Sequence, residues 1–168
     1  MKKLFLALAM TMMVGSVATV FATELNNTTK SGTTEVNYSL LNRYTITIPE
    51  AFNLSEEPGN PIEKELSASD VFIDNNTKLQ VVVEGANCNE TQWFIKDVTD
   101  ATNTFEYKVN SGDFVDGTSL KTGDVVLEVL AGDTDGGSSK LNFDLVNTVV
   151  KAGTYKDTLT FTSSIVSQ

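Results

Sequence analysis

Short stretches with an apolar residue at every second position dominate this sequence and constrain its fold more than any other feature. Val36–Leu40 and Tyr44–Ile48 both follow this pattern, with Ser, Thr or Asn between the apolar residues. A repeat of two residues is the period of a half-buried β-strand. No stretch after residue 22 has apolar residues at helical spacing, and β-branched residues are common in these stretches. The sequence therefore predicts an all-β fold.

Further strand-like stretches follow along the chain, separated by segments rich in Gly, Asp, Asn and Thr. They are Ile62–Leu66, Val71–Ile73, Leu79–Val83, Trp93–Ile95, Phe105–Val109, Val125–Leu130, Leu141–Leu145 and Tyr155–Phe161. Short strands without intervening helices bury their apolar faces when two antiparallel sheets stack. We expect a single antiparallel β-sandwich, either immunoglobulin-like or jelly-roll, because the pattern leaves the strand order open.

The first 22 residues have the three parts of a cleavable signal peptide. Lys2 and Lys3 precede an apolar stretch from Leu4 to Val14, and small residues precede Thr23. The alternative, a membrane anchor, needs about 20 uninterrupted apolar residues. We predict an exported protein, secreted or at the cell surface, with a signal peptide at 1–22, a flexible polar leader at 23–34 and the β-sandwich at 35–168.

The charge and the cysteine content exclude several classes of partner and of stabilisation. Removal of residues 1–22 changes the net charge from −10 to −12, which disfavours nucleic acid and anionic membranes as partners. Cys88 is the only cysteine, so the domain needs a hydrophobic core without internal disulfides. In an oxidising compartment Cys88 could still cross-link two copies of the chain.

The absence of histidine argues against an enzyme. Histidine is the commonest general base and the partner of Ser and Cys nucleophiles. Paired carboxylates could still hydrolyse a sugar across a cleft, but the paired acids of this chain lie in hydrophilic, loop-like segments. We therefore predict no catalytic residues and no bound cofactor.

One acidic turn raises the question of calcium. Asp133 and Asp135 lie two residues apart in a Gly-rich segment, and closely spaced carboxylates on such a turn often hold Ca²⁺. The segment lacks the further acids of a complete calcium loop. The alternative is a β-turn in which Asp and Gly supply the required backbone angles.

Trp93 is the candidate for a carbohydrate site. Sugar-binding sandwiches present exposed aromatic rings as flat apolar platforms. The alternative is a core position, because a Trp within an alternating strand often faces inward.

The segment Lys151–Thr162 resembles the closing strand of bacterial secreted β-sandwiches. WxL-type surface domains and spore-coat-U-like domains end in a similar Gly-Thr-Tyr and Leu-Thr-Phe pattern, which Gly153-Thr154-Tyr155 and Leu159-Thr160-Phe161 match. The resemblance implies structural roles: Gly153 permits a close approach, and Tyr155 resembles a tyrosine corner, whose hydroxyl bonds back to the backbone.

Two other segments, Tyr44–Pro49 and Val71–Thr77, look like early strands of exported immunoglobulin-like proteins of Gram-positive bacteria. Two departures limit these resemblances. Trp93 is followed by Phe94 and Ile95, so the Trp-x-Leu signature is missing, and spore-coat-U-like domains usually hold paired cysteines. The resemblance implies a fold and export, and no ligand.

Export, a sandwich pattern and missing catalytic groups together predict a surface, structural or adhesion-type protein that binds another protein or itself. Sandwiches expose sheet edges, to which an extended segment of another subunit can add a strand. The leader at 23–34 and the following Glu35–Leu41 are the candidate donor. Pairing of Val36–Leu40 within its own sandwich would count against this hypothesis. The alternative function is a secreted carbohydrate-binding module.

Overall fold

A computed structural model describes residues 36–112 and 119–168. The predicted signal peptide, residues 1–22, and the predicted leader, residues 23–34, lie outside the described residues. Residues Leu40–Gln168 form one compact unit, which holds every strand of the described residues.

Nine strands make up this unit, and the described residues contain no helix. They are β1 (Arg43–Thr47), β2 (Ile62–Phe72), β3 (Thr77–Gly85), β4 (Trp93–Asp97), β5 (Thr104–Ser111), β6 (Val125–Leu130), β7 (Gly137–Leu145), β8 (Tyr155–Lys156) and β9 (Leu159–Ser167). All pairings are antiparallel, which confirms the predicted all-β sandwich. The described residues therefore include no helix that could cross a membrane.

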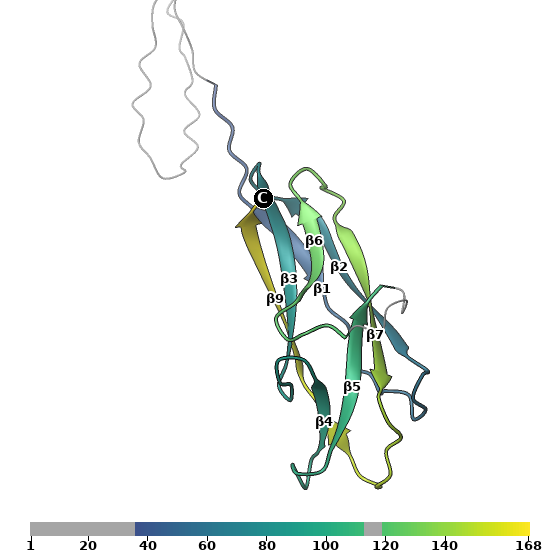
Figure 1. The fold of residues 1–168 in the computed structure, drawn as a ribbon. Helices are drawn as coiled ribbons and strands as arrows, with labels where there is room; N and C mark the ends of the chain where they lie inside the picture. The colour runs from purple at the N-terminus through teal and green to yellow at the C-terminus, as the bar shows by residue number, and fades with distance from the viewer. Residues whose placement is uncertain (1–35, 113–118) are drawn as a thin grey trace, which may run out of the picture. The chain divides into compact units, whose positions relative to one another are not determined.

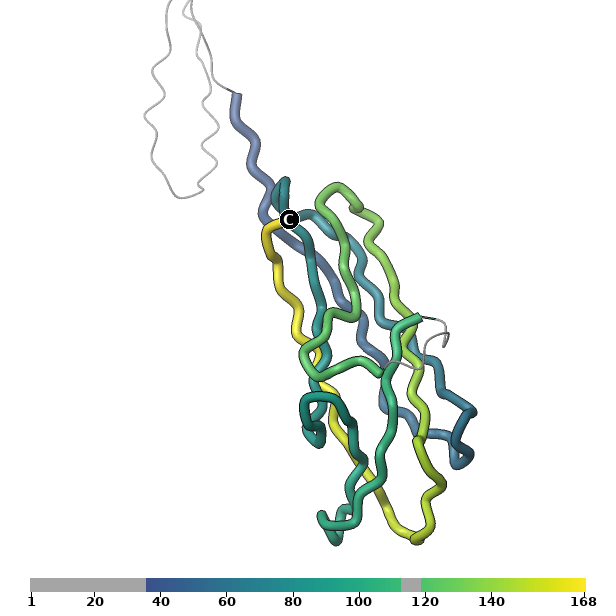
Figure 2. Tube along the Cα trace, viewed as in Figure 1, coloured from purple at the N-terminus to yellow at the C-terminus, as the bar shows by residue number. Residues whose placement is uncertain are grey.

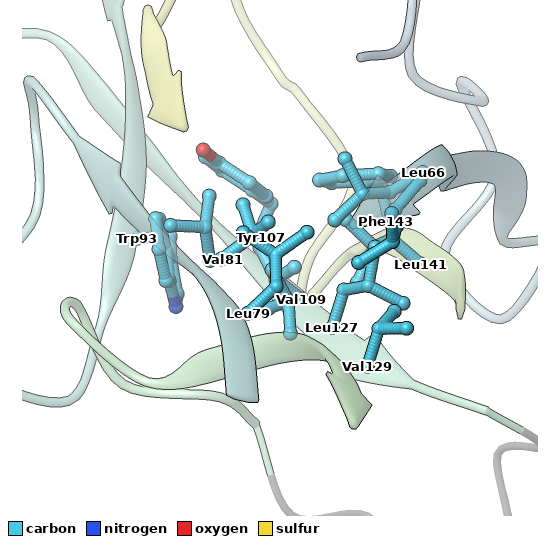
Figure 3. Close-up of a cluster of buried hydrophobic side chains, with 14 of the residues drawn as sticks. Leu66, Leu79, Val81, Trp93, Tyr107, Val109, Leu127, Val129, Leu141 and Phe143 are labelled. Carbon is cyan, nitrogen blue, oxygen red and sulfur yellow. The ribbon is translucent and has the colours of Figure 1, made fainter. Parts of the chain in front are cut away.

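The strands form two sheets. The larger sheet has the order β1-β2-β7-β5-β4-β8, and the smaller has the order β6-β3-β9 (Figure 1). Side chains from both sheets meet in one buried apolar core (Figure 3). Leu66, Val109 and Phe143 come from the larger sheet, and Leu79 and Val81 come from the smaller one.

Two sequence predictions of strands differ from the structure because of local backbone geometry. Ile62–Leu66 and Val71–Ile73 are not separate strands, since β2 runs through both as far as Phe72. Asp70 has a φ of +53°, and the alternation of exposed and buried residues shifts phase there. A residue in this left-handed conformation interrupts the regular pleat. The apolar residues before and after Asp70 are therefore out of phase, and the sequence of this single strand reads as two strands.

The predicted strand at Val36–Leu40 is absent. These residues are described, yet they belong to no strand, and the first strand begins at Arg43. The periodicity of the segment is that of a strand, but no described neighbour supplies its hydrogen bonds.

After β1 the chain stays extended. Figure 2 shows it running on along the sandwich before it turns back into β2. We name residues Ile48–Ser55 the strap. Phe52 and Leu54 in the strap are half-buried against the core, whereas Ala51 and Asn53 are exposed, so its side chains also alternate.

Candidate functional site

The outer edge of β9 carries no partner strand among the described residues. On its other side, β9 pairs with β3 over its whole length, from Leu159 opposite Gly85 to Ser167 opposite Thr77. Flanking bonds from Ala86 N to Thr158 O and from Gln168 N to Asn76 O fix which residues bond to β3. Because hydrogen-bonded positions alternate in an antiparallel pair, the backbone groups of every second residue point to the open edge.

These edge-facing residues are the odd-numbered ones of β9. The N–H and C=O groups of Leu159, Phe161, Ser163 and Ile165 face outward along the edge, while their side chains face the core. None of these four side chains is fully buried, although they occupy inward-facing positions. The sandwich is therefore incompletely covered along this side.

A groove of about 1060 Å³ lies between the strap and β9. Apolar side chains from both sheets and from the strap line its interior: Phe52, Ile95, Phe143, Leu145, Leu159 and Phe161. The segment from Thr148 to Thr154 also lines the groove. An apolar groove beside an unpaired strand edge is the kind of site that accepts an extended peptide.

Asp157 ties three parts of the chain together at the wall of the groove. Its Oδ2 accepts a 2.6 Å hydrogen bond from Tyr107 Oη, and its Oδ1 accepts bonds from the backbone N–H groups of Asn87 and Thr158. Burial is the main cause that raises the pKa of Tyr107 well above its usual range, and the hydrogen bond to Asp157 adds to it. The contact fixes where β9 begins.

Gly153 and Tyr155 are among the residues that line the groove. A Cβ atom at Gly153 would lie 2.5 Å from Oδ2 of Asp97, so only glycine fits there without a shift. The Tyr155 hydroxyl donates to the carbonyl of Lys151, four residues upstream, and accepts a bond from Asn103 Nδ2. This is the arrangement of a tyrosine corner.

Trp93 is fully buried, with an exposed fraction of 0%. Its Nε1 donates to the carbonyl of Leu120 at 2.6 Å, and its ring centroid lies 6.2 Å from that of Tyr107 (Figure 3). A ring that stacks on a sugar must be open to solvent. Because Trp93 lies in the core, it does not support the carbohydrate hypothesis.

Asp133 and Asp135 lie in the exposed turn between β6 and β7. The backbone of this turn is closed by bonds from Asp133 N to Leu130 O and from Gly136 N to Asp133 O. Within the described ranges, no group of three or more His, Cys, Asp or Glu side chains could hold a metal ion. Calcium binding at this turn stays a prediction.

Cys88 is half-buried in the link between β3 and β4, and its thiol donates to the carbonyl of Gly85. This hydrogen bond directs the sulfur back toward its own chain. A cross-link through Cys88 between two copies stays a prediction.

The segment before β1 exposes its apolar side chains. The exposed fractions are 90% for Val36, 86% for Tyr38 and 45% for Leu40. Asn42 Nδ2 donates to Asp74 Oδ2 at 2.9 Å, and the Arg43 guanidinium lies 4.1 Å from the centroid of the Phe72 ring. These two contacts anchor the end of the segment at the turn between β2 and β3.

Comparison with solved structures finds a similar chain in a chaperone–tip adhesin complex described as vital for synergistic activation of CFA/I fimbriae biogenesis. The TM-score is 0.53 at 17% sequence identity, over 74% of this chain and 42% of that chain. The likeness shows the fold. This chain thus spans less than half of the length of the chain it matches.

No family model matches the sequence, and no curated protein matches it. The resemblance to WxL-type and spore-coat-U-like domains, and to proteins of Gram-positive bacteria, therefore stays a prediction.

Sequence patterns did not predict the groove. Each residue that lines the groove has an ordinary core or loop identity, and the edge of β9 beside it has no outer partner among the described residues. Phe52 and Leu54 are the one signal that could have indicated it, since they alternate beyond Pro49, where the strand pattern was expected to end.

Proposed function

We propose that this chain is an exported, non-catalytic surface protein of adhesion or fibre type that assembles with copies of itself. The observation that carries the proposal is a pair of complementary features. One is the apolar groove beside the open edge of β9, and the other is the exposed, alternating segment Val36–Leu41.

The segment has the chemistry that the groove requires. An inserted strand would bond its backbone to the outward-facing groups of Leu159, Phe161 and Ser163, and every second side chain would enter the groove. Val36, Tyr38 and Leu40 are spaced in this way. Their burial would remove apolar surface from water on both partners, at about 25 cal/mol per Å².

The geometry favours a segment from a second copy. Asn42 is anchored beside Asp74, at the end of the sandwich where Ser167 lies opposite Thr77. Leu159 is eight residues further along β9, which is about 27 Å at strand spacing. The six residues from Val36 to Leu41 span only about 20 Å when extended, so within their own chain they reach no further than Phe161 and cannot pair with the whole stretch from Ser163 to Leu159.

Such a contact uses two different surfaces of each subunit. A head-to-tail contact of this kind repeats without closing and produces a linear assembly, unless its rotation closes a ring. The fold shared with a chain of a fimbrial chaperone–adhesin complex supports this function class. Cleavage after residue 22 and display outside the cell belong to the same proposal.

Light scattering coupled to size-exclusion chromatography tests the proposal on the chain from residue 23 to residue 168. We expect oligomers that grow with protein concentration. The double variant Val36→Asp/Tyr38→Asp should stay monomeric, because charges do not enter an apolar groove.

The matched control is Asn37→Asp/Ser39→Asp, which adds the same charge to the side chains that would face solvent. We expect it to assemble as the unmodified chain does. A monomer at every concentration, or equal behaviour of the two double variants, would overturn the proposal.

A further inference from the structure

The strap has backbone groups that no described residue uses. Within residues 36–112 and 119–168, no backbone hydrogen bond involves Pro49–Leu54. Contacts of Phe52 attach this segment to the core instead: its ring centroid lies 4.7 Å from that of Phe143, and Lys64 Nζ lies 5.2 Å from the Phe52 centroid. The strap is thus held through the side chains of Phe52 and Leu54, while its backbone has no partner among the described residues.

The strap and β9 form the two walls of the groove. Phe52 and Leu54 line it from one side, and Leu159 and Phe161 line it from the other. Phe143 and Leu145 of the larger sheet line the groove as well, and the Phe143 ring contacts that of Phe52. Both walls are extended and both have unused hydrogen-bonding groups, so a strand between them could pair on its two edges.

We propose that the strap is a second hydrogen-bonding wall, which pairs with an inserted strand on the side opposite β9. This inference rests on the proposed function, with Val36–Leu41 of a second copy as the inserted strand. Insertion converts residues Glu50–Leu54 from an unpaired segment into an edge strand. The inserted strand becomes an interior strand, and the smaller sheet grows from three strands to five.

Two-sided pairing has a kinetic consequence. A strand that pairs with β9 alone would remain a sheet edge, with half of its backbone groups facing water and open to competing segments. A strand enclosed by the strap must break bonds on both sides before it leaves. The strap therefore slows the release of the bound segment more than it changes the rate of binding.

Hydrogen exchange followed by mass spectrometry tests the inference. The protein is the monomeric Val36→Asp/Tyr38→Asp chain, and the probe is a synthetic peptide with the sequence of Glu35–Asn42. Fluorescence anisotropy of a labelled peptide measures binding separately. We expect the outward-facing amides of β9, those of Leu159, Phe161 and Ser163, and the alternate amides of Glu50–Leu54 that face the peptide, to exchange at least tenfold more slowly with bound peptide.

The outcomes separate this inference from the function on which it rests. Protection of β9 alone, with peptide bound, overturns the second wall and leaves strand donation intact. An absence of peptide binding overturns the proposed function, and the inference fails with it.

Proline substitutions provide an independent test, since proline has no N–H to donate. Glu50→Pro and Ala51→Pro remove neighbouring donors, of which only one faces an inserted strand. We expect one of the two variants to release the peptide at least tenfold faster, and Ala51→Val, which keeps the N–H, to leave release unchanged. Equal release from all three variants contradicts the inference.

Discussion

Tyr107 donates a 2.6 Å hydrogen bond from its hydroxyl to Oδ2 of Asp157, and this contact joins the centre of the larger sheet to the start of β9. Tyr107 belongs to β5, fifty residues earlier in the chain. Asp157 lies directly between β8 and β9, where the chain passes from one sheet to the other. The buried Tyr107 thus helps to set the position of β9 and of its open edge.

Substitution of Tyr107 by Phe should destabilise the domain by roughly 1.5–3 kcal/mol, the usual contribution of a hydrogen bond to a charged group. The phenyl ring keeps the packing, while Asp157 Oδ2 loses its donor. Urea unfolding followed by Trp93 fluorescence measures the change. At concentrations where the chain is monomeric, Tyr38→Phe is the control, because Tyr38 is 86% exposed in the single chain and its substitution should change the stability little. Equal stability of Tyr107→Phe and the unmodified chain would refute the role of this bond.

The same residue predicts a loss of stability at alkaline pH. Burial raises the pKa of Tyr107 in the folded protein above its ordinary value of 10.0. The folded state therefore keeps the proton while the unfolded state releases it, so stability is complete below pH 10 and falls above it. Unfolding free energies between pH 8 and pH 11 should decline more steeply for the unmodified chain than for Tyr107→Phe. Parallel declines would contradict this prediction.

Two glycines of the turn between β6 and β7 form a matched pair. Both have positive φ angles, +100° for Gly132 and +87° for Gly136. A Cβ atom at Gly132 would meet open space, whereas one at Gly136 would collide with the carbonyl of Ala68. Gly132→Ala should cost about 1–2 kcal/mol for the backbone conformation alone.

Gly136→Ala should cost roughly 1–3 kcal/mol more than Gly132→Ala, because the collision adds to the same backbone strain. Thermal unfolding by circular dichroism measures both variants. Similar melting temperatures for the two variants would contradict this prediction. They would show that β2, which carries Ala68, moves away from Gly136 at little cost.

Trp93 gives a direct test of the carbohydrate hypothesis, since it is the only tryptophan and is fully buried. Its emission should be blue-shifted in the folded protein and unchanged by a panel of mono- and oligosaccharides. A sugar-dependent shift in emission, with no change in folding, would restore the hypothesis.

The sequence predicted the class of the fold because the two-residue period is a local property. It survives as alternating side-chain burial along most of β1, β3 and β9. The prediction of β2 as two strands was wrong, because the left-handed conformation of Asp70 shifts the phase without ending the strand. The pattern of Val36–Leu40 was that of a strand, but pairing depends on a neighbour that the segment itself does not specify.

The groove was not predictable for a similar reason. Phe52, Phe143 and Phe161 lie far apart in the sequence, and the order of strands in the two sheets brings them together. Gly153 differs, because its close approach to Asp97 left a sequence signal in the Gly-Thr-Tyr pattern.

Cysteine cross-linking between copies tests the central claim most directly. In a Cys88→Ser background, Ser39→Cys is combined with Thr160→Cys or Thr162→Cys, which are exposed positions of β9. Ser39→Cys with Glu128→Cys on β6 is the control. Strand donation predicts a ladder of disulfide-linked dimers, trimers and longer chains on a non-reducing gel for at least one β9 pair, and none for the control. Monomers alone, or a ladder equally strong in the control, would contradict the account.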